Sequence, residues 1–228
     1  MPTVILVRHG RTAANADGVL AGRLPGVTLD ETGVRQAEAT AARLADVPIS
    51  TMVVSPMERC QQTADIIARA QPTSRPRLTD EALAEVDYGE WQGRDLADLA
   101  KEDLWTTVQR QPSAVTFPGG ESLRQMRQRA VDAIRGYDRS VGELYGPDAV
   151  WVAVSHGDVL KAVISDAYGM HLDLFQRVQV APASVSVVQY GAHRTSVVCV
   201  NTSGGDLGWL GRTEPADGAP VGGGPGHS

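Results

Sequence analysis

The chain alternates between short apolar runs and longer segments in which apolar residues recur every three or four positions. The short runs have the length of β-strands and occupy residues 4–7, 49–54, 150–154, 185–190 and 197–200. Several of them are rich in β-branched residues and do not alternate with polar residues, which is typical of strands covered on both faces. The pattern therefore predicts a largely buried sheet.

The longer periodic segments predict amphipathic helices over residues 32–44, 122–144 and 158–168. Ser122 is a candidate N-cap for the second of these helices, and Gly119-Gly120 would form the turn before it. Strands that alternate with helices favour an α/β fold, a three-layer α/β/α arrangement around a mainly parallel sheet of about six strands. The last two runs are separated only by residues 191–194, so they resemble a hairpin, and one strand should run antiparallel.

The segment of residues 78–118 breaks the alternation, and we call it the excursion. It is irregular and contains Trp91 and Trp105, which we interpret as packing residues. We expect short helices here, placed above the sheet as a lid. The length of the chain suits one domain, predicted over residues 1–212. Residues 213–228 are rich in Gly and Pro, and we expect this tail to be disordered.

Composition and charge narrow the function classes. The net charge is −6 and Lys and Arg form no block, so neither a nucleic acid nor an anionic membrane is the expected partner. No apolar stretch approaches the roughly 18 residues of a membrane span. Cys60 and Cys199 have neither metal-site spacing nor a disulfide framework, which suits a reducing compartment. Met1 leads almost directly into the first strand, leaving no room for a signal peptide, so we expect a cytoplasmic protein.

Two His-Gly pairs carry the most informative chemistry. Arg8-His9-Gly10 follows the strand at residues 4–7, and His156-Gly157 follows the strand at residues 150–154. Open α/β sheets bind ligands at the carboxyl ends of their strands. A neutral imidazole can attack phosphorus, and a guanidinium can hold phosphoryl oxygens bidentately. The two pairs therefore indicate phosphoryl chemistry.

Further polar residues follow the other predicted elements. Arg59 falls in the first turn of a helix after the strand at residues 49–54, where a positive side chain is explained better by a bound anion than by the helix dipole. Glu85 is a carboxylate with apolar neighbours in the excursion, and Glu90 and Asp87 compete with it for the role of acid. Asn15 could hydrogen-bond a phosphoryl oxygen.

Five strings occur in the order LVRHGRT, SPMERCQQTA, LAEVDYGEWQG, FPGGES and VSHGDV. Together they resemble the histidine phosphatase superfamily, in the branch that contains the cofactor-dependent phosphoglycerate mutases. The resemblance extends over residues 4–190 and implies a phosphoglycerate mutase-like fold.

The resemblance also implies roles for individual residues. His9 matches the nucleophile, which passes through a phosphohistidine intermediate, and Glu85 matches the acid that protonates the leaving oxygen. The phosphate-pocket positions are matched by Arg8, Arg59 and His156. The remaining positions near the phosphoryl group or the substrate are matched by Asn15, Gly22, Tyr88 and Gly157.

Physical chemistry is consistent with these roles. A phosphate monoester carries close to two negative charges, which two arginines and a protonated His156 would offset. A bound dianion would raise the pKa of His156, and partial burial would raise that of Glu85 towards the working pH. Since the arginines supply the positive charge, we expect no metal and no cofactor. The expected partner is a small-molecule phosphate ester, and the resemblance permits a monomer or a homodimer.

Three functions follow from these residues. The first is a metal-independent phosphatase acting on a small phosphorylated metabolite. The second is a phosphomutase of the phosphoglycerate mutase type, which would use bisphosphoglycerate. The excursion has only Arg94, Lys101 and Arg110 and lacks the paired arginine of the mutases, which favours hydrolysis, whereas Tyr88 keeps the mutase alternative open. The third is an inactive phosphate-binding protein, which the complete set of pocket residues disfavours.

His171 and His193 are interpreted as loop residues, and the roles of Arg11 and Arg23 stay open.

Overall fold

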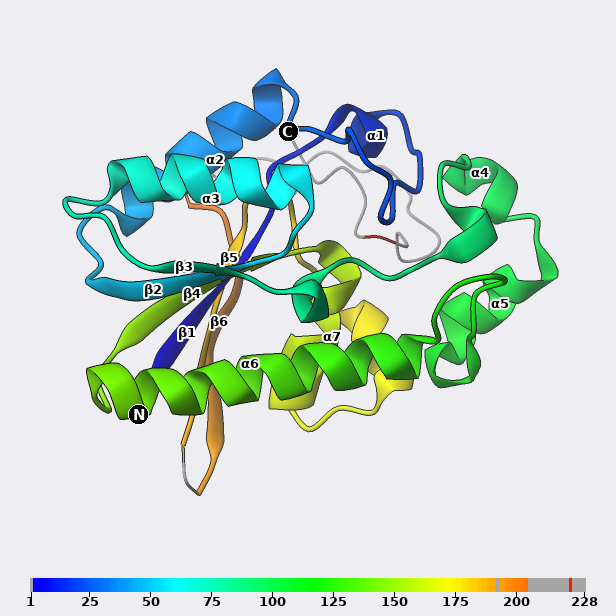
Figure 1. The fold of residues 1–228 in the computed structure, drawn as a ribbon. Coiled ribbons are helices and arrows are strands. Elements are labelled where there is room, and N and C mark those ends of the chain that lie inside the picture. Colours follow the sequence, from blue (N-terminus) through cyan, green and yellow to red (C-terminus); the bar gives the residue numbers. More distant parts are fainter. Residues whose placement is uncertain (1, 192, 205–221, 223–228) are drawn as a thin grey trace.

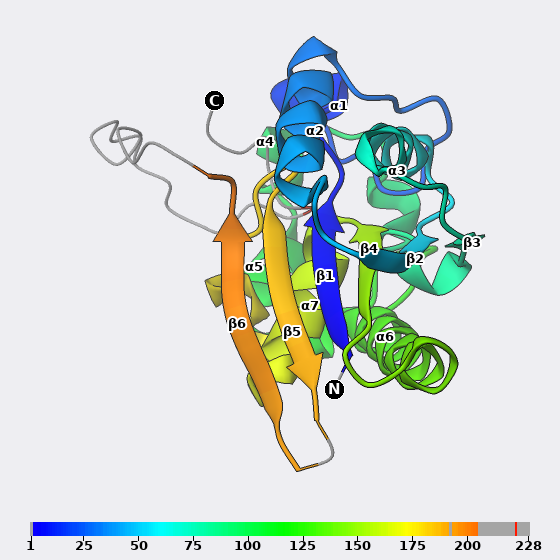
Figure 2. The same ribbon diagram turned by 90° about the vertical axis from the view of Figure 1, so that its left-hand side faces the viewer.

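The computed structural model describes residues 2–191, 193–204 and 222. Its centre is a six-stranded sheet in the order β3-β2-β4-β1-β5-β6 (Figure 2). The strands are β1 (Thr3–Arg8), β2 (Ile49–Val54), β3 (Arg77–Thr79), β4 (Val150–Ser155), β5 (Val185–Tyr190) and β6 (Thr195–Thr202). Only β5 is reversed, because it pairs antiparallel with both β1 and β6 while the other pairings are parallel. The predicted sheet with one antiparallel strand is confirmed.

Helices cover both faces of the sheet (Figure 1). On one side lie α2 (Glu31–Leu44) and α3 (Glu58–Ala70), and on the other lie α6 (Leu123–Tyr145) and α7 (Gly157–Ala167). Side chains along β1 alternate between the two layers: Val4 and Leu6 join the core under α6 and α7, and Ile5 and Val7 join the core under α2 and α3. The continuous apolar run of this strand therefore fills two cores, as the sequence predicted.

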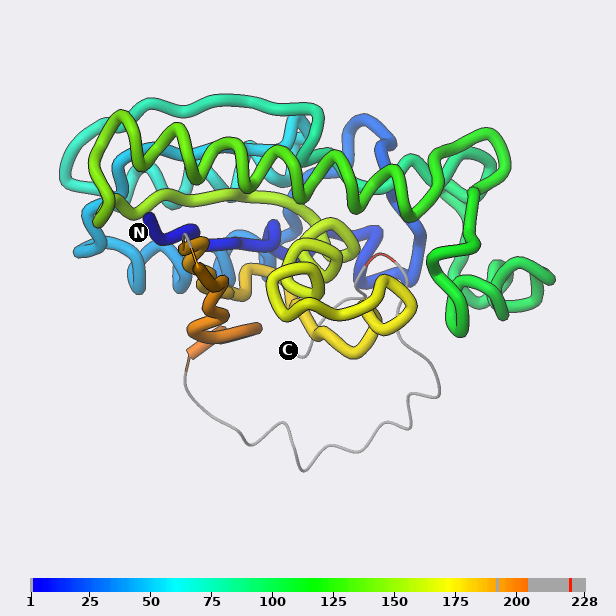
Figure 3. The backbone as a smooth tube through the Cα atoms, turned by 90° about the horizontal axis from the view of Figure 1, so that it is seen from below, coloured from blue at the N-terminus to red at the C-terminus, as the bar shows by residue number. Residues whose placement is uncertain are grey.

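Short helices follow one another between β3 and α6. They are η1 (Glu81–Leu83), η2 (Gly89–Trp91), α4 (Leu96–Leu99), α5 (Asp103–Arg110) and η3 (Pro112–Ala114). Of these, α4 and α5 lie beyond the first turns of α6 (Figure 1 and Figure 3). Trp91 is buried and stacks on Trp105 with ring centroids 6.1 Å apart, which agrees with a packing role for both. The buried residues of the excursion thus join the core under α6 and α7.

The elements begin and end close to the predicted residues. Ser122 caps α6 in a capping box with Gln125, as expected from its position after the Gly119-Gly120 turn. The strand β3 was not predicted, because it has only three residues and all of them are exposed. Two short helices were not predicted either: α1 (Ala13–Ala16) and η4 (Leu172–Arg177).

No helix in the described part of the chain combines the length and the apolar character needed to cross a bilayer. Apart from Gly222, residues 213–228 lie outside the described residues. The predicted disorder of this tail therefore stays a prediction.

Candidate active site

The site forms where three neighbouring parallel strands end. Arg8 is the last residue of β1 and pairs with Ser155, the last residue of β4, so that His9 and His156 follow side by side. The next strand, β2, leads into α3, whose second residue is Arg59. Because carboxyl ends of parallel strands lie at one edge of a sheet, residues about 150 positions apart meet there.

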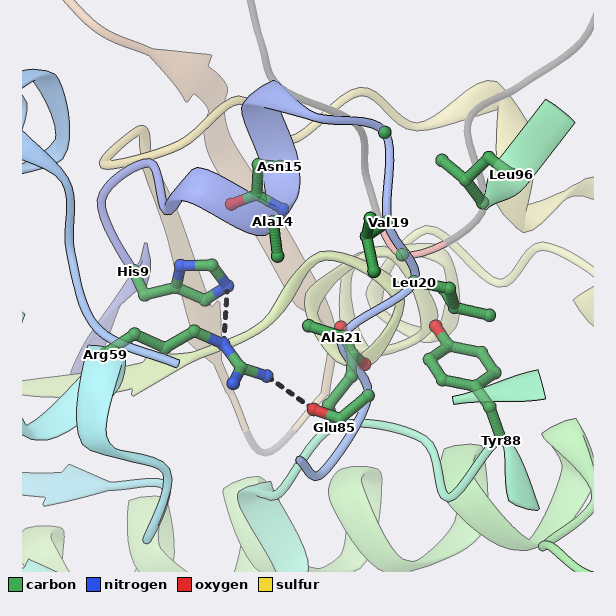
Figure 4. Close-up of a pocket in the computed structure, with 13 residues that line it drawn as sticks. His9, Ala14, Asn15, Val19, Leu20, Ala21, Arg59, Glu85, Tyr88 and Leu96 are labelled. Carbon is green, nitrogen blue, oxygen red and sulfur yellow. Dashed lines mark hydrogen bonds between the residues drawn. The ribbon is translucent and has the colours of Figure 1, made fainter. Parts of the chain in front are cut away.

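The two imidazoles meet edge to face, with ring centroids 5.2 Å apart. His9 Nδ1 lies 2.7 Å from the carbonyl oxygen of Gly10, to which only a protonated nitrogen can donate. The Nε2 atom of neutral His9 is therefore unprotonated, and it accepts from Nε of Arg59 at 3.3 Å (Figure 4). The geometry leaves a lone pair on Nε2, which is what a nucleophilic nitrogen requires.

The ring of His156 is fixed at both nitrogens. Nη2 of Arg59 donates to its Nδ1 at 3.1 Å, and its Nε2 lies 2.7 Å from Oγ of Ser55. Because Nδ1 accepts, Nε2 carries the proton and donates to Ser55. Arg59 thus contacts both histidines.

The guanidinium groups of Arg8 and Arg59 are buried. Nη1 of Arg8 donates to the carbonyl oxygen of Val180 at 2.8 Å, and Nη2 of Arg59 donates to that of Gly22 at 2.7 Å. Gly22 has a left-handed backbone conformation (φ +52°), which favours glycine. Nη1 of Arg59 is buried and has no hydrogen-bond partner among the described residues. A buried donor in this position calls for an anionic acceptor.

Burial governs the ionisation of these groups. It lowers the pKa values of His9 and His156 well below their usual range, and the nearby charge of Arg59 lowers both further. Burial also lowers the pKa of Arg8 to about 10, which still leaves the guanidinium charged at neutral pH. Without an anion, both imidazoles are therefore neutral, and a bound dianion would favour protonation of His156, as the sequence analysis assumed.

Glu85 enters the same pocket from the excursion and is only 3% exposed. Burial, followed by the negative charge of Asp158, raises the pKa of Glu85 to about 7. Its competitors lie elsewhere: Asp87 accepts from the amide of Gly89, Glu90 is exposed, and neither lines the pocket. Glu85 is therefore the acid that the geometry favours.

A cluster of charged residues that the sequence analysis did not identify holds Glu85 in place. Arg129 on α6 donates to the carbonyl oxygens of Ala82, Ala84 and Glu85 at 2.8 to 3.1 Å. Arg23 also donates to the Glu85 carbonyl, at 2.8 Å. Both arginines form ion pairs with Glu121. The motif FPGGES contains Glu121, but nothing in the sequence connects it with Arg23 or Arg129.

The other predicted substrate residues differ in their positions. Asn15, Gly22 and Tyr88 line the pocket, whereas Gly157 is buried at the start of α7 and is not among the lining residues. Thr12 caps α1, and the side-chain oxygen of Asn15 completes the capping box by accepting from Thr12. The hydroxyl of Tyr88 donates to Asp158 at 2.9 Å.

Two glycines support the loop that carries His9. A Cβ atom on Gly10 would lie 2.4 Å from the carbonyl oxygen of Gly33 in α2, and a Cβ on Gly33 would lie 1.9 Å from that of Arg11. Backbone therefore packs directly on backbone behind His9. Arg11 itself forms an ion pair with Asp30 at 2.8 Å and does not line the pocket.

Two further histidines of the described residues lie away from this site. His171 caps η4 by accepting from the amide of Asp173, and His193 is exposed near the turn between β5 and β6. Both are loop residues, as predicted. Within the described residues, no group of three His, Cys, Asp or Glu side chains could hold a metal ion.

The sequence model of the histidine phosphatase superfamily (branch 1) matches residues 4–203. The chain therefore belongs to the histidine phosphatase superfamily, as its motifs predicted. Members of this superfamily are phosphatases and phosphomutases, which supports an enzymatic role.

Curated relatives carry names from both groups. Phosphoserine phosphatase 1 of Hydrogenobacter thermophilus is 29% identical over 204 residues, which cover 88% of this chain and 92% of the relative. A probable phosphoglycerate mutase of Proteus mirabilis is 32% identical over 196 residues, covering 83% of this chain and 86% of the relative. A bifunctional protein of Mycobacterium tuberculosis is 32% identical over 209 residues, or 88% of this chain. The match spans only 54% of that relative, about half its length.

Solved structures share the fold. The α-ribazole phosphatase of Shigella flexneri superposes with a TM-score of 0.75 at 25% identity, over 88% of this chain and 96% of the other. A mycobacterial glucosyl-3-phosphoglycerate phosphatase superposes with a TM-score of 0.78 at 23% identity, over 87% and 98% of the two chains. The predicted phosphoglycerate mutase-like architecture is thereby confirmed.

Proposed function

We propose that the protein is a metal-independent phosphatase that hydrolyses a small phosphorylated metabolite through a phosphohistidine at His9. The observation that carries the proposal is the protonation pattern at one strand edge. Nε2 of His9 is unprotonated and lies beside buried, cationic Arg59, and Glu85 in the same pocket is still partly protonated at neutral pH. Phosphoryl transfer needs a nucleophile, an anion-binding group and an acid in these states, so the pattern supports the proposal.

The proposed reaction has two steps. The phosphoryl oxygens bind between Arg8, Arg59 and His156, and Nε2 of His9 attacks phosphorus while the ester P–O bond breaks. Glu85 gives its proton to the leaving oxygen, so that the alcohol departs neutral. The buried cations offset the charge that develops on the phosphoryl oxygens.

In the second step, ionised Glu85 removes a proton from water as the water oxygen attacks the phosphohistidine. The P–N bond breaks, inorganic phosphate forms, and His9 and protonated Glu85 are regenerated. The same carboxyl group therefore acts first as acid and then as base. A pKa near the working pH suits both roles.

The excursion supports hydrolysis rather than mutase activity. Arg94 forms an ion pair with Glu102 at 2.6 Å, and Lys101 forms one with Asp98 at 2.7 Å. Neither these cations nor Arg110 is among the residues that line the pocket. The described residues of the excursion thus bring no further positive charge to a second anionic group, which a phosphoglycerate mutase must hold.

The test compares His9→Ala with His171→Ala, an exposed histidine outside the pocket. Both variants and the native chain are assayed on p-nitrophenyl phosphate and on phosphorylated metabolites, with and without bisphosphoglycerate. We expect the native chain and His171→Ala to release inorganic phosphate, and His9→Ala to release none. After quenching, the native chain and His171→Ala should carry a covalently bound, acid-labile phosphoryl group, and His9→Ala should carry none. Retained hydrolysis by His9→Ala would contradict the proposed nucleophile, and isomer formation would favour the mutase.

A further inference from the structure

Asp158 is a buried acid beside the pocket, and the proposed reaction gives it no contact with substrate. It lies in the first turn of α7, two residues after His156, and its side chain is fully buried. A carboxylate next to a site for a dianion weakens the binding of that dianion. Its charge acts on Glu85, but this effect does not account for the donors that its side-chain oxygens bind.

The two oxygens of Asp158 have different surroundings. Oδ1 accepts from Nζ of Lys161 at 3.3 Å, and Lys161 also donates to Gln176 and lies over the ring of Phe175. Since Gln176 and Phe175 belong to η4, Lys161 ties Oδ1 to that element. Oδ2 accepts instead from the hydroxyl of Tyr88, which lines the pocket.

Oδ2 has a second donor, and this donor lies in the pocket. The amide of Gly222 donates to it at 3.1 Å, and the carbonyl oxygen of Gly222 accepts from Nη2 of Arg8 at 3.2 Å. Gly222 lines the same pocket as His9 and Glu85. Asp158 therefore offers an acceptor and Arg8 offers a donor to a group in the pocket. The amide and the carbonyl oxygen of Gly222 bind to these two groups.

We propose that Asp158 and Arg8 form a subsite for the alcohol part of the substrate, which takes a hydroxyl or ammonium group and disfavours a second anionic group. The inference rests on the proposed phosphatase function and narrows its substrate class. A hydroxyl or ammonium would replace the amide of Gly222 at Oδ2 of Asp158, while an oxygen of the ester replaces its carbonyl at Arg8. Gly222 must leave this position when substrate binds.

Charge determines which groups the subsite rejects. A carboxylate or second phosphate placed at Oδ2 would face Asp158 without a proton between them, and like charges at hydrogen-bond distance repel strongly in a buried site. Lys161 is bound to the other oxygen and to η4. The favoured substrates are therefore monophosphates of amino alcohols or polyols.

The test uses four esters that differ only at the second carbon: ethyl phosphate, 2-hydroxyethyl phosphate, phosphoethanolamine and phosphoglycolate. The full chain should hydrolyse phosphoethanolamine with a kcat/KM at least tenfold above that for phosphoglycolate, with 2-hydroxyethyl phosphate above ethyl phosphate. Asp158→Asn should lower the ratio of phosphoethanolamine to phosphoglycolate at least tenfold. A ratio is used because a general loss of turnover cancels from it.

Asp138→Asn is the matched control, because Asp138 is also buried but bonds the indole nitrogen of Trp151, and it should keep the native ratio. If the native ratio of phosphoethanolamine to phosphoglycolate is one or less, the subsite proposal is overturned, even if Asp158→Asn does not fold. If Asp158→Asn folds and keeps the native ratio, the proposal is overturned as well. Either result with active hydrolysis of p-nitrophenyl phosphate leaves the phosphatase function intact. A folded native chain that hydrolyses none of the esters, p-nitrophenyl phosphate included, overturns both proposals.

Discussion

Replacing Glu85 with Gln tests the proposed general acid, because glutamine keeps the shape of the side chain and cannot give up a proton at neutral pH. The carboxyl group is 3% exposed, and burial together with the charge of Asp158 raises its pKa from 4.5 to about 7. At pH 7 such a group is protonated in about half of the molecules, against about one in 300 for an ordinary carboxyl group. The fold therefore increases the fraction of protonated Glu85 by roughly 150-fold at this pH.

The assay measures kcat/KM between pH 6 and pH 9 for an alkyl phosphate and for p-nitrophenyl phosphate. This parameter depends on the pKa values of the free enzyme and on the steps up to and including phosphorylation of His9. A raised pKa means that the protonated form is present below about 7 and is lost as the pH rises through that value. For the native chain, kcat/KM on the alkyl ester should thus fall about tenfold per pH unit above 7.

Glu85→Gln should lower kcat/KM for the alkyl ester about 100- to 10,000-fold and remove this dependence on pH. The p-nitrophenolate group leaves readily without a proton, so its ester should be slowed far less. Equal slowing of the two esters would refute the role of acid. A fall above pH 7 that persists in Glu85→Gln would assign the pKa to another group.

Three further outcomes follow from the site. Arg59→Lys should lower kcat/KM about 100- to 1,000-fold in steady-state assays, because a lysine cannot bind the phosphoryl group bidentately; a smaller loss than tenfold would contradict its place in the pocket. Arg129→Met should lower the free energy of unfolding in urea by about 2 kcal/mol and reduce turnover, because the carbonyls of Ala82 and Ala84 lose this donor and that of Glu85 keeps only Arg23; unchanged turnover would show that Arg23 alone is enough to position Glu85. EDTA should leave hydrolysis unchanged, and a loss restored by a divalent cation would argue against the metal-free reaction.

The sequence predicted those parts of the fold and site that depend on local pattern. Buried strands followed by His-Gly pairs placed His9 and His156 at strand ends, and strand order alone then brought them together. The edge strand β3 has no such pattern, because an exposed three-residue strand buries nothing. Patterning thus predicts central elements better than edges.

The supporting residues could not be predicted, because they act through contacts between distant segments. Arg129 lies on a long amphipathic helix where a surface arginine is the ordinary expectation, and only the fold places it under the carbonyl of Glu85. Asp158 likewise resembled an ordinary first-turn acid of a helix, which its sequence position explains without a ligand. The role of each residue comes from contacts made in buried surroundings, and which residues are buried depends on the complete fold.

The bare contact between Gly10 and Gly33 has a consequence for variation in this protein. No side chain separates the helix from the loop, so there is no flexible group that could move aside and absorb even one added methyl. An inactivating substitution at Gly33 would therefore involve no functional group. Mutational intolerance and chemical participation are thus separate properties: Gly33 has only the first, and it packs on the residue next to His9.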